Sequence, residues 1–275
     1  MRRHKLSTVL LFLLALLLAE LVSIPWFAVA RMKKENPAET ALMRQRVAEA
    51  ESAGKPFRVT QKWIPLSRIP KHLVDAVIVA EDGTFFTHGG VDWFEVRESL
   101  EKDIKEGRAA RGASTITQQL AKNLFLSTSK DPVRKVKELI ITFLMETELE
   151  KDRILEIYLN IVEWGPGIFG VEAASETYFG AQAENLTLDQ AARLAAVIPS
   201  PLRHRPDSDG KYVLRRKGIV LERMGARNMV PASPEIPLAG PGVAARDSEG
   251  LRPGVPGETA GQDTLEIDEG GSNGF

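Results

Sequence analysis

A row of polar side chains with hydroxyl, amide and ammonium groups occupies residues 112–126, GASTITQQLAKNLFL. Gln118 and Lys122 are about one helical turn apart, and Ser114 and Thr115 stand at the start of the same predicted helix. Together with free backbone amides at the helix start, these groups could hold one polyoxygenated anion, such as a phosphorylated sugar. The simpler alternative is that Thr115 and Gln118 only form a capping box and that Lys122 is a surface residue.

Two adjacent carboxylates, Glu81 and Asp82, end an apolar helix predicted over residues 70–82, and a glycine-bearing loop follows them. A carboxyl group that leaves an apolar environment at a loop edge has its pKa raised toward the range of a general base. The alternative is a solvated helix end. The four histidines, at positions 4, 72, 88 and 204, lack metal-ligand spacing, so we predict no metal site in the protein.

Basic residues crowd the start of the next predicted helix, in SKDPVRKVKE, among them Lys130, Arg134 and Lys135. With Lys122 they describe a clamp for a diphosphate. Because Arg134 and Glu138 are four residues apart, an ordinary intrahelical salt bridge is the alternative explanation. The clamp is not a P-loop, because no G-x-x-x-x-G-K-[ST] sequence occurs.

The composition narrows the class of protein. The formal net charge of the 275 residues is −1, and no basic run is interleaved with aromatic residues, which argues against a nucleic-acid partner. Cysteine is absent, so disulfides, thiol catalysis and cysteine-ligated zinc are excluded. The length suits one folded domain with appendages.

The N-terminus predicts a membrane anchor. A short basic stretch, residues 1–6, precedes an apolar segment over residues 7–30 that is long enough to span a bilayer as a helix despite Glu20. We therefore expect residues 1–6 in the cytoplasm, an anchor at 7–30 and a membrane-proximal segment at 31–62. The alternative is a cleaved signal peptide, because Ala-Val-Ala at 28–30 resembles a cleavage site.

The elements that must position these groups are predicted to be helical, and no segment shows a convincing strand period, so the expected fold class is all-α. Thr187 and Gln190 form a predicted capping box, and Asp131-Pro132 reads as an N-cap followed by proline at N1. Besides the helices at 70–82 and 112–126, we expect helices at 93–107, from 132 to about 149, from Asp152 onward, at 188–197 and at 211–225.

The C-terminal end has a different composition. Residues 231–275 hold six Pro and nine Gly, with eight acidic residues against two Arg. Such a segment buries too little apolar surface to offset the entropy of ordering, so we predict a disordered acidic tail over 230–275.

Several long motifs occur in an order that resembles the peptidoglycan glycosyltransferases, and the resemblance runs from about Trp63 to Pro206. It implies a membrane-anchored, lysozyme-like helical glycosyltransferase domain, here residues 63–229, that lies on the periplasmic side of the inner membrane and takes lipid II as substrate. The motifs are EDGTFFTHGG, GASTITQQLAKNLFL, RKVKE, RILEIYLN and WGPGIFGVEAASETYFG.

The resemblance also implies roles for individual residues. Glu81 matches the catalytic glutamate that deprotonates the acceptor 4-hydroxyl, and Glu138 matches a second catalytic carboxylate near the departing diphosphate. Lys130 stands where many members have arginine, so the charge is kept but the bidentate fork is lost. The expected substrate-binding residues are Asp82, Ser114, Thr115, Gln118, Gln119, Lys122, Lys130, Arg134 and Lys135.

The expected activity is polymerisation of lipid II into β-1,4-linked glycan strands with release of undecaprenyl diphosphate. No cofactor is required by the sequence, although a divalent cation, Mg²⁺ or Mn²⁺, could bridge the substrate diphosphate. Lipid-linked glycan and the inner membrane are the expected partners, and other cell-wall synthesis or division proteins are candidates. The alternatives are a lysozyme-like lytic enzyme and a non-catalytic membrane-tethered scaffold.

Overall fold

The computed structural model describes residues 20, 22–106, 114–129 and 131–229. The predicted cytoplasmic segment 1–6, most of the predicted anchor, Lys130 and the predicted tail lie outside the described residues. Within the described ranges, every helix is too short or too polar to cross a membrane. The anchor itself therefore stays a prediction.

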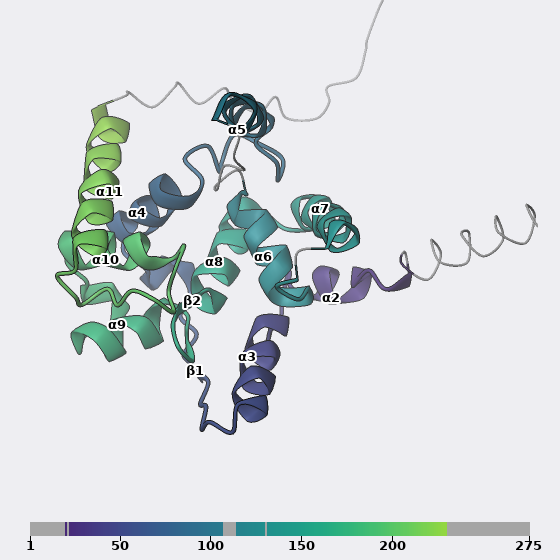
Figure 1. The fold of residues 1–275 in the computed structure, drawn as a ribbon, viewed down its shortest axis with the longest axis horizontal. Helices are drawn as coiled ribbons and strands as arrows, with labels where there is room; N and C mark the ends of the chain where they lie inside the picture. Colours follow the sequence, from purple (N-terminus) through teal and green to yellow (C-terminus); the bar gives the residue numbers. More distant parts are fainter. Residues whose placement is uncertain (1–19, 21, 107–113, 130, 230–275) are drawn as a thin grey trace, which may run out of the picture. The chain divides into compact units, whose positions relative to one another are not determined.

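The described part of the chain is mostly helical, with ten α-helices and two short 3₁₀ turns, at Leu66–Arg68 and Ala183–Asn185. Figure 1 shows their arrangement, in which the α4, α10 and α11 helices pack on one another and α6 packs against both α7 and α8. The helices are α2 (Trp26–Arg31), α3 (Ala41–Ser52), α4 (Lys71–Glu81), α5 (Trp93–Glu106), α6 (Ile116–Phe125), α7 (Pro132–Glu148), α8 (Lys151–Ile161), α9 (Val171–Phe179), α10 (Leu188–Val197) and α11 (Lys211–Met229).

The predicted helices are confirmed within the described residues, although α6 begins only at Ile116, after Ser114 and Thr115, and positions 107 and 112–113 of the predicted helices lie outside those residues. The start of α7 has the expected cap, in which Asp131 accepts a hydrogen bond from the Val133 amide and Pro132 occupies the first turn. The capping box of Thr187 and Gln190 begins α10. The last helix extends beyond the predicted range, to Met229.

The all-α prediction needs one correction, because a small three-stranded sheet is present. The strands β1 (Thr60–Gln61), β2 (Glu163–Gly165) and β3 (Ile168–Phe169) lie in the order β1-β3-β2, with β3 parallel to β1 and antiparallel to β2. Strands of two or three residues are too short to show an alternating pattern. The tight β2–β3 connection depends on Gly167, whose φ is +76° and where a Cβ would lie 2.3 Å from the Arg58 carbonyl oxygen.

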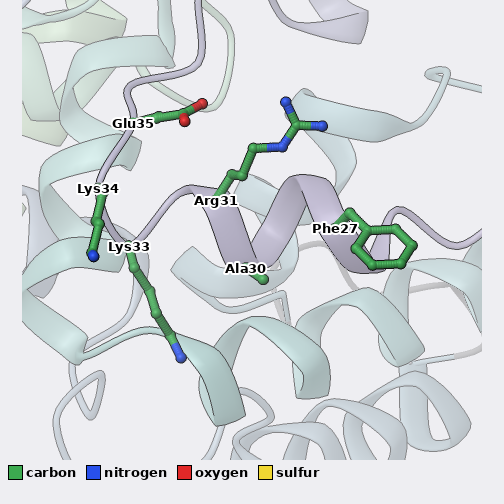
Figure 2. A pocket seen from close by; sticks show the side chains of 6 residues that line it. All are labelled: Phe27, Ala30, Arg31, Lys33, Lys34 and Glu35. Carbon is green, nitrogen blue, oxygen red and sulfur yellow. The ribbon is translucent and has the colours of Figure 1, made fainter.

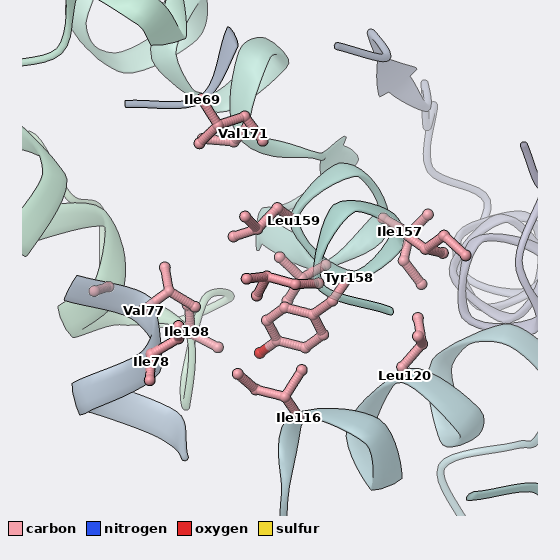
Figure 3. Close-up of a cluster of buried hydrophobic side chains, with 14 of the residues drawn as sticks. Ile69, Val77, Ile78, Ile116, Leu120, Ile157, Tyr158, Leu159, Val171 and Ile198 are labelled. Carbon is pink, nitrogen blue, oxygen red and sulfur yellow. The ribbon is translucent and has the colours of Figure 1, made fainter. Parts of the chain in front are cut away.

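The core surrounds α8. Ile157, Tyr158 and Leu159 are all fully buried, and Figure 3 shows them among side chains that come from α4, α6 and α9. The next residue, Asn160, is buried and donates from Nδ2 to the Ile64 carbonyl (2.9 Å) while its Oδ1 accepts from the Ile64 amide (2.8 Å). The α8 helix thus holds the segment that leads from β1 into α4.

The last residues of the predicted anchor belong to α2, which packs against α7 and fully buries Val29. An ion pair joins Glu20 to Lys137 of α7, so this acidic residue of the apolar segment has a partner. Figure 2 shows a pocket beside α2, where Arg31 and Lys33 extend to opposite sides of the chain. Because these cations do not converge, the pocket is not a candidate binding site.

Candidate active site

The carboxylate of Glu81 stands at the end of α4, where the apolar helix meets the start of α6. The following residue, Asp82, joins the two helices: its Oδ2 accepts a hydrogen bond from the Ile116 amide (2.9 Å), and its Oδ1 is 2.9 Å from His88 Nε2. The Gly90 amide donates to His88 Nδ1 (3.1 Å), so Nε2 carries the proton and donates to Asp82. Both carboxylate oxygens of Asp82 are therefore engaged within the protein.

The start of α6 is held by a capping box. The Thr115 hydroxyl accepts from the Gln118 amide (3.2 Å) and donates to the Gly90 carbonyl (2.6 Å), while Gln118 Oε1 accepts from the Thr115 amide (3.0 Å). Thr115 and Gln118 thus form the capping box that the sequence offered as the simpler alternative to anion binding. Because the Ile116 and Gln118 amides already have partners, they are not the free donors that the sequence suggested.

The α6 helix presents Gln119 and Lys122 to the site, whereas Ile116, Leu120 and Leu124 of the same helix are buried in the core. Gln119 Nε2 donates to Glu81 Oε2 at 2.9 Å. The sequence pattern and the fold therefore agree in bringing a carboxylate, an amide and an ammonium group to one place.

The Glu81 carboxyl is a weaker acid than an ordinary glutamate, mainly because it is buried, with only 8% of its side chain exposed. Burial raises the pKa of the Glu81 carboxyl from 4.5 to about 7, against the opposing effects of the Gln119 hydrogen bond and of the positive charges of Arg216 and Lys122. The negative charge of Asp82 adds to the increase. Glu81 Oε1 is buried and has no hydrogen-bond partner among the described residues; Arg216 Nη2 lies 4.0 Å away.

The Lys122 side chain is partly buried, and its ammonium group forms no hydrogen bond or ion pair with any residue that the structure describes. Burial lowers the pKa of its ammonium group, which the negative charges of Glu138 and Glu81 oppose and the positive charges of Arg134 and Lys135 reinforce. An ammonium group with this much desolvation and no fixed partner is suited to an anion that arrives with a ligand.

Glu138 is 3% exposed and forms ion pairs with Arg134 at 2.6 Å and with Lys135. The ordinary intrahelical salt bridge considered above is therefore present. Arg134 Nε also donates to the Ser129 carbonyl at 2.5 Å, which fixes the guanidinium. With Lys122, these residues form a cluster in which three cations surround one carboxylate, and the excess of positive charge suits a diphosphate.

Two expected binding residues are less informative. Ser114 precedes α6 and is exposed, and Lys130 lies outside the described residues. Substrate contact by these two residues, and by the other polar residues named above, stays a prediction.

Two residues beside Glu81 were missed by the sequence reasoning. Tyr158 of α8 donates from its hydroxyl to Gln119 Oε1 at 3.1 Å, and Arg216 reaches Glu81 from α11 while its Nε donates to the Ala196 carbonyl (3.1 Å). Tyr158 lies inside the RILEIYLN motif, so its polar group was a signal that could have been used. Arg216 is one of several cations along α11, and nothing in the sequence distinguishes it.

Comparison with known proteins identifies the class. The family model described as Transglycosylase matches residues 48–225, and the chain belongs to this family. The resemblance found in the ordered motifs is confirmed.

Individual relatives agree with this assignment. A biosynthetic peptidoglycan transglycosylase from Herminiimonas arsenicoxydans is 40% identical over 220 residues, which cover 80% of this chain and 95% of that protein. One from Janthinobacterium sp. (strain Marseille) is 45% identical over 191 residues, covering 70% and 83%. Another from Aromatoleum aromaticum is 49% identical over 169 residues, covering 62% and 74%.

The raised pKa of Glu81 predicts that this residue destabilises the fold at neutral pH. The pKa of this carboxyl is near 7 in the folded protein and 4.5 in the unfolded chain, so the free energy of unfolding falls as the pH rises from 4.5 to 7. We expect Glu81→Gln to raise the free energy of unfolding by up to about 3 kcal/mol at pH 8, and to have little effect at pH 4. Urea unfolding of the full chain in detergent, followed by circular dichroism, measures this difference; a gain independent of pH would contradict the burial argument.

Proposed function

We propose that this chain polymerises lipid II into β-1,4-linked peptidoglycan glycan strands and releases undecaprenyl diphosphate. It is a peptidoglycan transglycosylase, and it works outside the cytoplasm, as its family does. The observation that supports the proposed site most directly is that a buried carboxyl whose pKa is near 7, that of Glu81, lies close enough to the Lys122 ammonium for the two charges to interact. Among the described residues, this ammonium has no hydrogen-bond or ion-pair partner.

In the proposed reaction Glu81 acts as the general base. Its carboxylate takes the proton from the 4-hydroxyl of the acceptor sugar, the hydroxyl oxygen forms a bond to the anomeric carbon of the donor, and the bond from that carbon to the diphosphate oxygen breaks. The electron pair leaves with the lipid diphosphate, and the proton stays on Glu81. A single displacement of an α-linked diphosphate gives the β-linkage.

The basic cluster stabilises the departing group. The negative charges of both Glu81 and Glu138 act on the Lys122 ammonium. We propose that this ammonium stabilises the negative charge that develops on the diphosphate. Arg134 and Lys135 remain tied to Glu138, and we propose that Glu138 acts by holding these two cations in place. This assigns the second carboxylate an electrostatic part in catalysis.

The proposal also covers the cellular location of the catalytic domain and the relationship of its fold to lysozyme. We place the catalytic domain on the periplasmic side of the inner membrane, attached by the predicted anchor over residues 7–30. We also propose a lysozyme-like relationship, because a glutamate serves as the acid or base of glycan chemistry in both. In this reading the membrane presents the lipid substrate to the domain.

A divalent cation enters the proposal only with the substrate. Within the described ranges, no group of three or more histidine, cysteine or acidic side chains is arranged to hold a metal ion. The cationic surroundings of Lys122 also do not fit a resident metal. A Mg²⁺ or Mn²⁺ ion bridging the diphosphate would therefore be held by phosphate oxygens, and no step is assigned to it.

The two other candidate functions are disfavoured by particular features. A lytic enzyme releases a neutral sugar hydroxyl, so the excess of cations around Glu138 would have no charge to stabilise. A non-catalytic scaffold gives no reason to bury the Glu81 carboxyl at a cost in stability.

Incubation of the purified full chain with lipid II tests the proposal. We expect glycan polymer and free lipid diphosphate from the wild type, and none from Glu81→Gln, because the amide keeps the shape but cannot accept the proton. Purified cell-wall sacculi should stay intact with either protein. Soluble fragments released from sacculi by the wild type, or full polymerisation by Glu81→Gln, would overturn the assignment.

Lys122→Ala should reduce kcat/KM for lipid II by about 30- to 1,000-fold, the range expected when one preorganised charge at a transition state is lost. Lys55→Ala is the matched control, since Lys55 is exposed and far along the chain from α6. Its rate should match the wild type. A loss of less than threefold at Lys122 would instead indicate a surface residue without a part in the reaction.

A further inference from the structure

Tyr158 is a buried polar residue to which the reaction assigns no part. Its side chain is fully buried on α8, and Figure 3 shows its ring in the middle of the apolar cluster with the hydroxyl oxygen directed toward the side on which Ile78 and Ile116 lie. Among the described residues the hydroxyl forms one hydrogen bond, to Gln119 Oε1 at 3.1 Å. A buried hydroxyl with a single polar partner is oriented by that partner and orients it in turn.

The partner, Gln119, has an amide with two different ends. Its Oε1 accepts from Tyr158, so its Nε2 faces Glu81 and donates to Oε2 at 2.9 Å. The opposite orientation would place Gln119 Oε1 against Glu81, where a carbonyl oxygen accepts a hydrogen bond only from the protonated carboxyl. The orientation of one amide thus decides which protonation state of Glu81 is favoured.

We propose that Tyr158 is a positioning residue that fixes the Gln119 amide with its N–H toward Glu81, and so keeps Glu81 in the state that accepts a proton. Tyr158 acts through Gln119 and does not touch the substrate. The inference rests on the proposed function only in taking Glu81 as the base.

Other features of the site support this inference. Burial, with a smaller effect from the negative charges of Glu81 and Asp82, raises the pKa of Tyr158 well above 10, so the hydroxyl remains a donor throughout the neutral range. The charged groups that face Glu81 are Lys122 from α6, Arg216 from α11 and its own neighbour Asp82. Among the described residues, the Tyr158 hydroxyl is hydrogen-bonded to Gln119 and to none of these charged groups, so removing the hydroxyl leaves the charges in place.

Tyr158→Phe removes the hydroxyl and keeps the ring. The Gln119 amide can then present either end to Glu81, which raises the pKa of Glu81 above its value of about 7. We expect kcat for lipid II at pH 6.5 to fall about three- to tenfold, as for the loss of one hydrogen bond, with KM within about twofold. The defect should shrink as pH rises toward 9, because Glu81 then loses its proton in both proteins.

Tyr178→Phe provides the matched control. Tyr178 is a partly buried tyrosine whose hydroxyl donates to the Trp164 carbonyl at 3.2 Å, so its removal costs a comparable hydrogen bond away from Glu81. We expect any change in rate for this variant to be the same at every pH. A Tyr158→Phe defect that is also independent of pH, or absent, would contradict the positioning role.

A double-mutant cycle with Gln119→Met tests the path of the effect. If Tyr158 acts through Gln119, adding Tyr158→Phe to Gln119→Met should change kcat less than twofold, whereas independent effects would multiply. Infrared titration of the Glu81 carboxyl in the same variants gives a readout that needs no substrate: Tyr158→Phe should raise the midpoint by about half a unit to one unit, as the predicted loss of kcat requires. An unchanged midpoint refutes the inference, whereas failure of the wild type to polymerise lipid II refutes only the proposed function.

Discussion

The burial of one carboxyl group, that of Glu81 at the end of α4, is the constraint on which the rest of the site depends. The apolar face of α4 packs against α10 and α11, which carries the glutamate out of water before the helix ends. Asp82 then ties this end of α4 to the first turn of α6, and the register of α6 sets Gln119 against the carboxylate and Lys122 beyond it. The position of the base and that of the cation are consequently determined by the same junction between two helices.

Burial shifts the pKa values of Glu81 and Lys122 in opposite directions. Burial favours the neutral carboxyl at Glu81 and disfavours the charged ammonium at Lys122, so each group is destabilised in the free protein. In the proposed complex the substrate supplies what each lacks, a transferable proton for Glu81 and a diphosphate for Lys122. Arg134 and Lys135 differ, because Glu138 already holds them and their charges are in place before the ligand binds. The proposed site therefore combines two cations that are held in place before the substrate binds, Arg134 and Lys135, with two groups that gain a proton or a counter-charge only from the substrate, Glu81 and Lys122.

Local patterns predicted much of this structure. Apolar spacing and capping residues gave the positions of α4, α6, α7 and α10, and with them the neighbourhood of Glu81 and Lys122. The β2–β3 hairpin was missed because its strands are too short for a period, and Tyr158 was missed because its partner Gln119 lies 39 residues away in the chain. The contact of Arg216 with Glu81 depends on how α11 packs on α4 and α10, which a single sequence does not reveal.

The central claim is that burial gives Glu81 the acidity of a base that works near neutral pH. Labelling the glutamate side chains of the full chain with carbon-13, and subtracting the spectrum of Glu81→Gln, isolates the Glu81 carboxyl resonance for titration in detergent. The account predicts a midpoint near pH 7, with the resonance of a protonated carboxyl still present at pH 6. A midpoint near 4.5, the ordinary value, would show that Glu81 is solvated and would contradict the mechanism.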